Sequence, residues 1–114
     1  LPATCHHDDP RLMELAEQFV NPYPFGPQLF YLWGHSYEFD DKNNWHVIEE
    51  FCAKMGGHGD IWYATNMEIY EYIEASRKIV SSVDGSRIYN PTVTELYLEG
   101  GENILLKPGE MRCL

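Results

Sequence analysis

Apolar positions recur at helical spacing in three stretches of this 114-residue chain, and we predict a helix in each. The first covers residues 8–21, because an acidic pair followed by Pro10 suits the start of a helix. The other two cover residues 43–56 and 65–76. Glu68 falls near the first turn of the last one, where a negative charge favours the helix dipole.

Two continuous apolar and aromatic runs lie between these helices, at residues 28–34 and 60–64. Their lengths and their flanking residues favour short strands that are buried on both faces, as in a parallel sheet. Residues 35–40 then form the loop that leaves the first strand. Helices alternating with buried strands predict βαβ units over residues 1–80.

The pattern changes after residue 80. Short runs at residues 87–89, 94–98 and 104–107 predict strands, separated by turns at Asp84-Gly85 and Gly100-Gly101. Residues 81–114 therefore form a β-rich tail. It is either a small antiparallel sheet or a set of strands that covers an edge of the main sheet.

Charge and composition exclude several classes of protein. The chain has 8 basic and 18 acidic residues, a net charge of −10, which disfavours binding to nucleic acid or to an anionic membrane. No apolar run reaches the ~18 residues of a membrane span. Residues 1–4 are no signal peptide and lack Met, which indicates a cut or processed start, and the compartment stays undecided. The 3 cysteines are too widely spaced for a disulfide scaffold or a zinc ribbon.

The best catalytic candidate is His35, which follows the predicted strand at residues 28–34. Sites in α/β folds form at the carboxyl ends of strands, and histidine transfers protons near neutral pH. Gly34 would let a ligand or another backbone approach, while Glu38 or Asp40 could orient the ring. The alternative is a histidine that hydrogen-bonds locally beside a loop, and the residues alone do not separate the two.

A second cluster combines Cys5, His6, His7, Asp8 and Asp9, all of which are ligand types for a transition metal. Adjacent side chains point in different directions, and the two aspartates can cap the following helix. We therefore favour a cluster without a metal, and His6 and His7 stay weak candidates. If residues 4–6 end another strand, one histidine could still face the site.

Several segments, taken in order, resemble one family. They are residues 4–7, 29–39, 44–45 with 48–52, 60–72, 89–91 and 106–110. Together they resemble the C-terminal stretch of polysaccharide deacetylase-like proteins of the NodB-homology group, carbohydrate esterase family 4. The last two segments resemble the strand-rich tail of a bacterial subgroup. The resemblance covers nearly the whole chain but only the later half of the family's domain, and its order is more specific than any one motif.

The resemblance implies an α/β fold, a partial (β/α) barrel of NodB type with a short β-rich C-terminal tail. It also implies metal-dependent removal of acetyl groups from N- or O-acetylated sugars, with a divalent metal, typically zinc, that polarises the carbonyl. A late histidine of the family follows a Leu-x-x-His-like motif, which residues 32–35 match, so His35 becomes the general acid. Leu32 and Trp33 would line the acetyl pocket, and Glu38 joins them on the substrate side.

Two departures limit this interpretation. The family's base aspartate and its His-x-x-x-His metal ligands have no match here, so we expect the chain alone to be inactive and to bind no metal. The alternative is a non-catalytic carbohydrate-binding or structural module that has lost the metal site. The expected partner is an acetylated polysaccharide or oligosaccharide, and unpaired sheet edges would favour a homo-oligomer.

Overall fold

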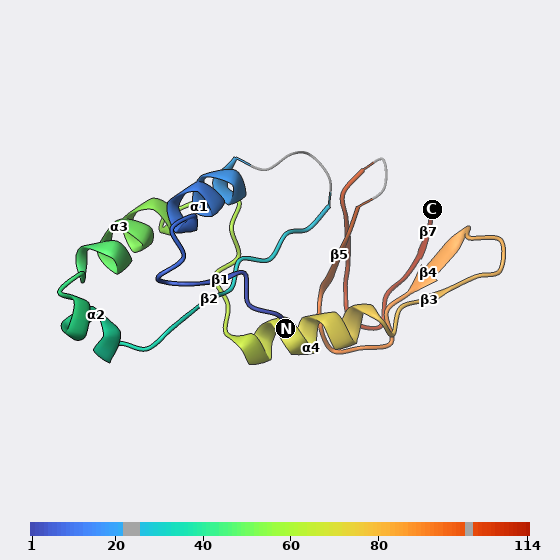
Figure 1. Ribbon diagram of the computed structural model, residues 1–114. Coiled ribbons are helices and arrows are strands. Elements are labelled where there is room, and N and C mark those ends of the chain that lie inside the picture. Colours follow the sequence, from blue (N-terminus) through green and yellow to red (C-terminus); the bar gives the residue numbers. More distant parts are fainter. Residues whose placement is uncertain (22–25, 100–101) are drawn as a thin grey trace. The chain divides into compact units, whose positions relative to one another are not determined.

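The protein is described by a computed structural model that covers residues 1–21, 26–99 and 102–114. It divides into two compact units, Leu1–Trp62 and Tyr63–Leu114, and we describe each by itself (Figure 1). Within the described residues, no helix combines the length and the apolar character needed to cross a membrane.

The first unit contains one parallel strand pair and three helices. In chain order these are β1 (Cys5–His6), α1 (Leu12–Val20), β2 (Leu32–Trp33), α2 (Tyr37–Lys42) and α3 (His46–Met55). β1 pairs with β2 so that Cys5 lies opposite Leu32 and His6 opposite Trp33. The carboxyl ends of both strands therefore meet at one edge, where α2 begins after a short loop.

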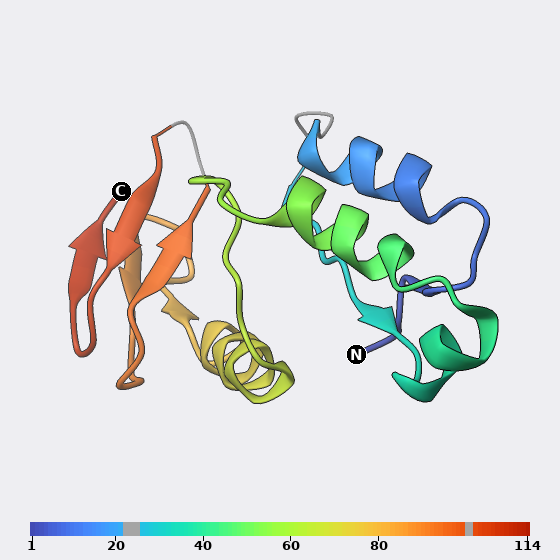
Figure 2. The same cartoon turned by 90° about the vertical axis from the view of Figure 1, so that its left-hand side faces the viewer.

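Helices α1 and α3 lie side by side and supply most of this unit's core (Figure 2). Leu12 and Ala16 of α1 are buried, because the helical spacing of the apolar residues puts them on one face. Phe30, just before β2, connects the two helices. Its ring lies 5.5 Å from Phe19 of α1 and 5.5 Å from Phe51 of α3.

The second unit is a helix followed by two antiparallel sheets. Its elements are α4 (Asn66–Ser76), β3 (Val80–Ser81), β4 (Arg87–Tyr89), β5 (Leu96–Leu98), β6 (Ile104–Leu106) and β7 (Met111–Cys113). One sheet has the order β3-β4-β7, and β5 pairs with β6 in the other. Leu96 and Leu106 lie opposite each other on β5 and β6 and are fully buried.

Three predicted helices are confirmed, as α1, α3 and α4. The start of α4 is a capping box: Thr65 Oγ1 accepts from the Glu68 backbone N–H, and the Glu68 carboxylate accepts from the Thr65 N–H at 2.7 Å. The β-rich tail is antiparallel, and its turn at Asp84-Gly85 is confirmed, with Gly85 at φ 70°. The predicted turn at Gly100-Gly101 lies outside the described residues.

The predicted partial (β/α) barrel of NodB type is wrong. In the described residues, the strands form three separate sheets of two, three and two strands, and only β1 and β2 pair in parallel. Even part of a (β/α) barrel needs its parallel strands side by side in one sheet. Among the described strands, the single parallel pair β1–β2 has no further neighbour, and the other two sheets are antiparallel.

Both predicted buried strands also need correction. Residues 28–34 contain only the two-residue β2, and Trp33 on it is 49% exposed rather than buried. Residues 61–65 have no regular structure, and Trp62 and Tyr63 are more than half exposed. The expected exit loop contains helix α2 instead, and β3 and β7 were not predicted. Cys52 of α3 is exposed.

Candidate functional site

The candidate site lies where β1 and β2 end. The backbone N–H of His7, just after β1, donates to the carbonyl of Trp33 at 3.0 Å, so the parallel pairing continues past the last strand residue. Residues 7 and 8 then form a turn, and α2 follows β2 after three residues. As a result, His6, His7 and Asp8 come from one strand end, and Glu38 faces them from the first turn of α2.

One carboxylate oxygen, Oε2 of Glu38, contacts the rings of both His6 and His7. It lies 2.9 Å from Nε2 of His7 and 3.2 Å from Nε2 of His6, and it accepts the backbone N–H of His35 at 3.0 Å. The hydrogen bond from His7 lowers the pKa of Glu38 to about 2, helped by the His35 N–H and the nearby histidine charges. Glu38 is therefore a charged acceptor under ordinary conditions.

These contacts also fix where the ring protons lie. The Asp8 backbone N–H donates to Nδ1 of His6 at 3.1 Å, so the ring proton of neutral His6 is on Nε2, facing Glu38. In neutral His7, a proton on Nε2 is shared with Glu38, which leaves a lone pair on Nδ1. That Nδ1 atom is buried and accepts no hydrogen bond from any described residue.

His7 is 3% exposed, and its ring occupies space that is free only because residue 34 is a glycine. A Cβ atom on residue 34 would lie 1.9 Å from Cδ2 of His7, which no side chain can tolerate. The sequence suggested that Gly34 allows a close approach, and the group that approaches is the His7 ring. Phe39 of α2 covers that ring with a centroid distance of 4.3 Å.

Asp8 carries the remaining charge of the cluster. Its Oδ1 lies 3.3 Å from Nδ1 of His7, and its Oδ2 forms an ion pair with Lys42 at the end of α2. The hydrogen bond from Lys42 lowers the pKa of Asp8, and the same bond raises the pKa of Lys42. His6, His7 and Asp8 each offer one ligand atom within 4.8 Å of the others, so this set could hold a metal ion.

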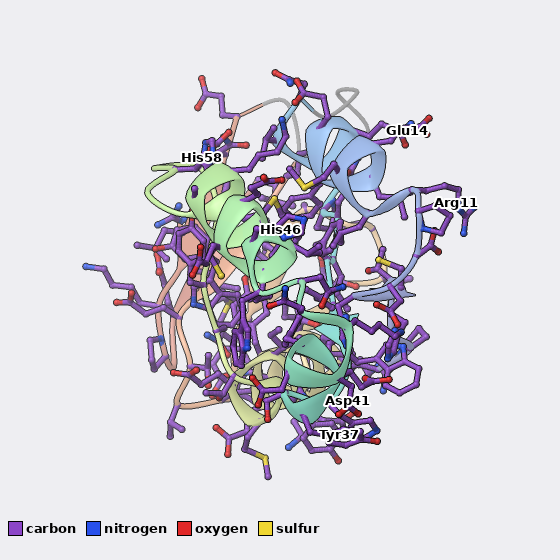
Figure 3. The ribbon with its side chains drawn as sticks, turned by 60° about the vertical axis from the view of Figure 1, so that its left-hand side comes forward. Arg11, Glu14, Tyr37, Asp41, His46 and His58 are labelled. Carbon is purple, nitrogen blue, oxygen red and sulfur yellow. The ribbon has the colours of Figure 1, made fainter. Side chains whose placement is uncertain are left out.

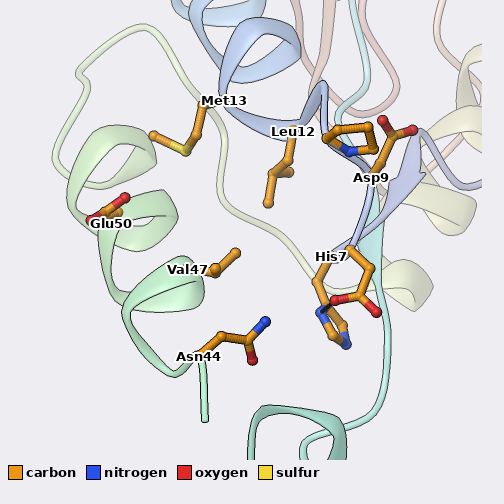
Figure 4. A pocket seen from close by; sticks show the side chains of 9 residues that line it. His7, Asp9, Leu12, Met13, Asn44, Val47 and Glu50 are labelled. Atoms are coloured by element: carbon orange, nitrogen blue, oxygen red, sulfur yellow. Dashed lines mark ion pairs between the residues drawn. The ribbon is translucent and has the colours of Figure 1, made fainter. Parts of the chain in front are cut away.

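A pocket of ≈ 260 Å³ opens beside His7, between the start of α1 and the start of α3 (Figure 4). Figure 4 shows the Asn44 amide and the His7 ring on facing walls. Oδ1 of Asn44 is buried and, like Nδ1 of His7, has no hydrogen-bond partner in the part of the chain that the structure describes. The pocket is lined by His7, Asp8, Asp9, Pro10, Leu12, Met13, Asn44, Val47 and Glu50.

Two other predicted site residues, Trp33 and His35, form an exposed row with Tyr37 beside the cluster. The ring of His35 is exposed and stacks on Tyr37 at 5.3 Å, and its other neighbour is Trp33 at 6.3 Å. Tyr37 projects outward from α2 (Figure 3). Trp33 also packs edge-on against His6 at 4.5 Å, while Leu32 is partly buried.

Of the two carboxylates proposed to orient His35, one touches only its backbone and the other is engaged elsewhere. Glu38 accepts the backbone N–H of His35, and Asp40 accepts the indole N–H of Trp45 at 2.7 Å. Sequence reasoning did not identify Lys42 or Asn44. The four-residue spacing of Glu38 and Lys42 would have placed both on one helix face, had α2 been recognised.

Comparison with known proteins gives no relative: no family model, curated protein or solved structure matches this chain.

Proposed function

We propose that this chain forms part of a metal-dependent, deacetylase-like hydrolase that removes acetyl groups from N- or O-acetylated sugars. Within it, His35 is the general acid that protonates the leaving amine or alkoxide. The observation that carries the proposal is the placement of His35 at the end of β2, exposed and held between Trp33 and Tyr37. The type of reaction, removal of an acetyl group, is taken from the resemblance to the deacetylase family.

The row Trp33–His35–Tyr37 suits a sugar ligand. Trp33 is 49% exposed and Tyr37 is 60% exposed, so two aromatic faces are open to solvent on either side of a proton-transfer group. Aromatic rings supply rigid, amphipathic contact area, and binding sites combine such surfaces with a few polar groups. A sugar that lies on this row would bring its acetylated substituent close to the His35 imidazole.

The chemistry needs two further groups. Hydrolysis of an acetyl group requires a base for the attacking water and a positive centre at the carbonyl oxygen, and a divalent metal such as zinc supplies the second when it is bound. The donor types of His6, His7 and Asp8 fit such an ion. No residue of this chain matches the family's base aspartate, so we expect the complete active site to need residues beyond these 114.

The test is His35→Ala in the protein as its gene encodes it, with acetate release measured on N-acetylglucosamine oligomers and on acetylated xylan. Loss of a general acid lowers turnover by about 10²–10⁴-fold. The same variant should lose the alkaline limb of the pH–rate profile. His46→Ala, an exposed histidine on α3, is the matched control and should retain turnover. Full activity of His35→Ala would overturn the assignment.

A second candidate function is glycan binding without chemistry, and the exposure of Trp33 and Tyr37 favours it. Calorimetric titration with acetylated and deacetylated oligosaccharides separates the two functions. A binding module would bind a glycan, lose that binding in Trp33→Ala, and release no acetate. The hydrolase would bind the acetylated form and convert it.

A further inference from the structure

We propose that His7 and Asp8 bind one divalent transition-metal ion, such as Zn²⁺, through Nδ1 and the carboxylate, with His6 as a third donor and Glu38 orienting both rings. The sequence alone favours a cluster without a metal. The inference does not depend on the hydrolase proposed above, because every observation that carries it lies in the geometry of the first unit.

The first observation is the buried Nδ1 of His7, which makes no hydrogen bond in the described chain and has the Asp8 carboxylate 3.3 Å away. The side chain is 2% exposed, and Nδ1 has no hydrogen bond within the described chain. Buried polar atoms in folded proteins almost always have a partner, so an exception calls for a ligand or an ion. Nδ1 is also the nitrogen that keeps a free lone pair, because Glu38 holds the proton on Nε2.

The second observation is Glu38 itself. Histidines that bind metals usually donate their other ring N–H to a carboxylate, which fixes the ring and raises its basicity as a ligand. Glu38 stands in this relation to His7 at 2.9 Å and to His6 at 3.2 Å. A carboxylate that faces two adjacent histidines on the side away from Asp8 is the arrangement that such a site requires.

The third observation is the spacing of the donor atoms. Nδ1 of His7 and Oδ1 of Asp8 are 3.3 Å apart. Two ligands of a tetrahedral zinc ion, each bonded at about 2.0–2.1 Å, are separated by about 3.3–3.4 Å. Nδ1 of His6 lies 3.9 Å from Oδ2 of Asp8 and already accepts the Asp8 backbone N–H, so His6 joins only when that bond opens.

Two arguments from the sequence stood against metal binding by this cluster, and the structure removes both. Adjacent residues point in different directions along a strand, but residues 7 and 8 form a turn, and the rings of His6 and His7 lie 4.2 Å apart with their planes tilted by 33°. Asp8 does not cap the following helix. The N-cap of α1 is Arg11, which makes no side-chain cap hydrogen bond, and Oδ1 of Asp9 accepts the Arg11 backbone N–H at 2.9 Å.

The pocket offers room for the other ligands. His7 and Asp8 both line it, so water can fill the remaining coordination positions from that side. A water bound to the ion would carry two hydrogens, and the buried Oδ1 of Asn44 is an unused acceptor on the facing wall (Figure 4). One ligand would therefore account for both buried side-chain atoms that make no hydrogen bond in the described part of this unit.

Lys42 sets the affinity of the site. Its ammonium group pairs with Oδ2 of Asp8, so it partly neutralises the carboxylate that would attract the ion. Lys42→Met removes this competing charge and should tighten metal binding several-fold. The competing interpretation is a protonated His7 between Asp8 and Glu38, a buried ion pair that needs no metal.

The experiment is a calorimetric titration of the protein with Zn²⁺, after removal of any affinity tag and treatment with a chelator. Binding of Co²⁺ in parallel should give the visible absorption bands of a low-symmetry site. We expect one ion per chain. Asp8→Asn and His7→Gln should abolish uptake, and Glu38→Gln should weaken it by about 10–100-fold. His46→Ala should bind as the wild type does. Circular dichroism confirms that each variant is folded, and Asp8→Asn keeps the test valid if His7→Gln does not fold.

Two outcomes would overturn the proposal. The first is a folded protein that takes up neither ion, or that takes them up equally well after Asp8→Asn. The second is uptake that appears only in Lys42→Met, because the lysine would then be the natural cation of the cluster. Both measurements are made without substrate, so their result is distinct from that of the turnover test on His35.

Discussion

Nε2 of His7 lies 2.9 Å from Oε2 of Glu38, although the two residues are 31 positions apart in the chain. The contact joins the turn after β1 to the first turn of α2. The same carboxylate oxygen also lies 3.2 Å from Nε2 of His6, so it positions both rings. Since Glu38 also holds the backbone of His35, one carboxylate connects the buried cluster with the exposed aromatic row.

The pH dependence of stability should report on this carboxylate. The pKa of Glu38 is about 2 in the folded protein, below the ordinary value of 4.5, so the charged form stabilises the fold. That contribution is complete above about pH 4.5 and is lost as pH falls toward 2. Chemical unfolding at several pH values should therefore show Glu38→Gln to be less stable than wild type at pH 7, with a difference that shrinks below pH 4.5. A difference that stays constant down to pH 2.5 would contradict this.

Gly34→Ala should disrupt the cluster through a steric collision and through backbone strain, because Gly34 has φ 156°. The new Cβ would collide with the His7 ring at 1.9 Å, and overpacking of this kind costs about 1–3 kcal/mol. We expect a lower denaturant midpoint together with weaker metal binding. Gly59→Ala is the control, because no atom lies within 4 Å of its Cβ position and its stability should hardly change. Equal midpoints for the two variants would show that the His7 ring can move away at little cost.

The sequence could predict those elements that depend on residues close together in the chain. The helices α1, α3 and α4 follow from apolar spacing, and α4 also follows from its capping box of Thr65 and Glu68, which acts within four residues. Strand pairing depends on distant partners, so an apolar run such as residues 60–64 cannot reveal that it lacks one. The prediction of a partial barrel was wrong for this reason.

The site was predictable only in its parts. His6, His7, His35 and Glu38 were candidates because of their chemistry, but which of them meet depends on α2. That helix has six residues and buries only Phe39, too short a pattern to show helical spacing. Glu38 was therefore assigned to a substrate or to the ring of His35, whereas its carboxylate contacts the rings of His6 and His7 and the backbone N–H of His35.

Unpaired edges of the short parallel sheet should favour self-association. β1 and β2 pair only with each other among the described strands, and exposed Trp33 lies on β2. Open edges and exposed aromatic side chains tend to bind another copy of the chain. We expect multi-angle light scattering to show a dimer or larger species that grows with protein concentration. A monomer at the highest concentration reached would refute this expectation.

In the second unit, the strongest single effect should come from Asn90, which is fully buried. Its amide nitrogen donates to the carbonyl groups of Thr94 at 2.7 Å and Leu106 at 3.2 Å, and its oxygen accepts both the N–H and the hydroxyl of Thr92. The side chain thereby ties the loop before β5 to the end of β6.

Asn90→Ala would leave these groups without their partner in a site that water cannot easily reach. Each unsatisfied buried group costs about 1–3 kcal/mol, so we expect a loss in that range or above it. Asn90→Asp keeps the acceptor for Thr92 but loses both donated bonds and buries a charge, so it should be at least as destabilising as alanine. Urea unfolding followed by circular dichroism measures both variants. An aspartate variant as stable as wild type would show that the two donated bonds contribute nothing to the fold.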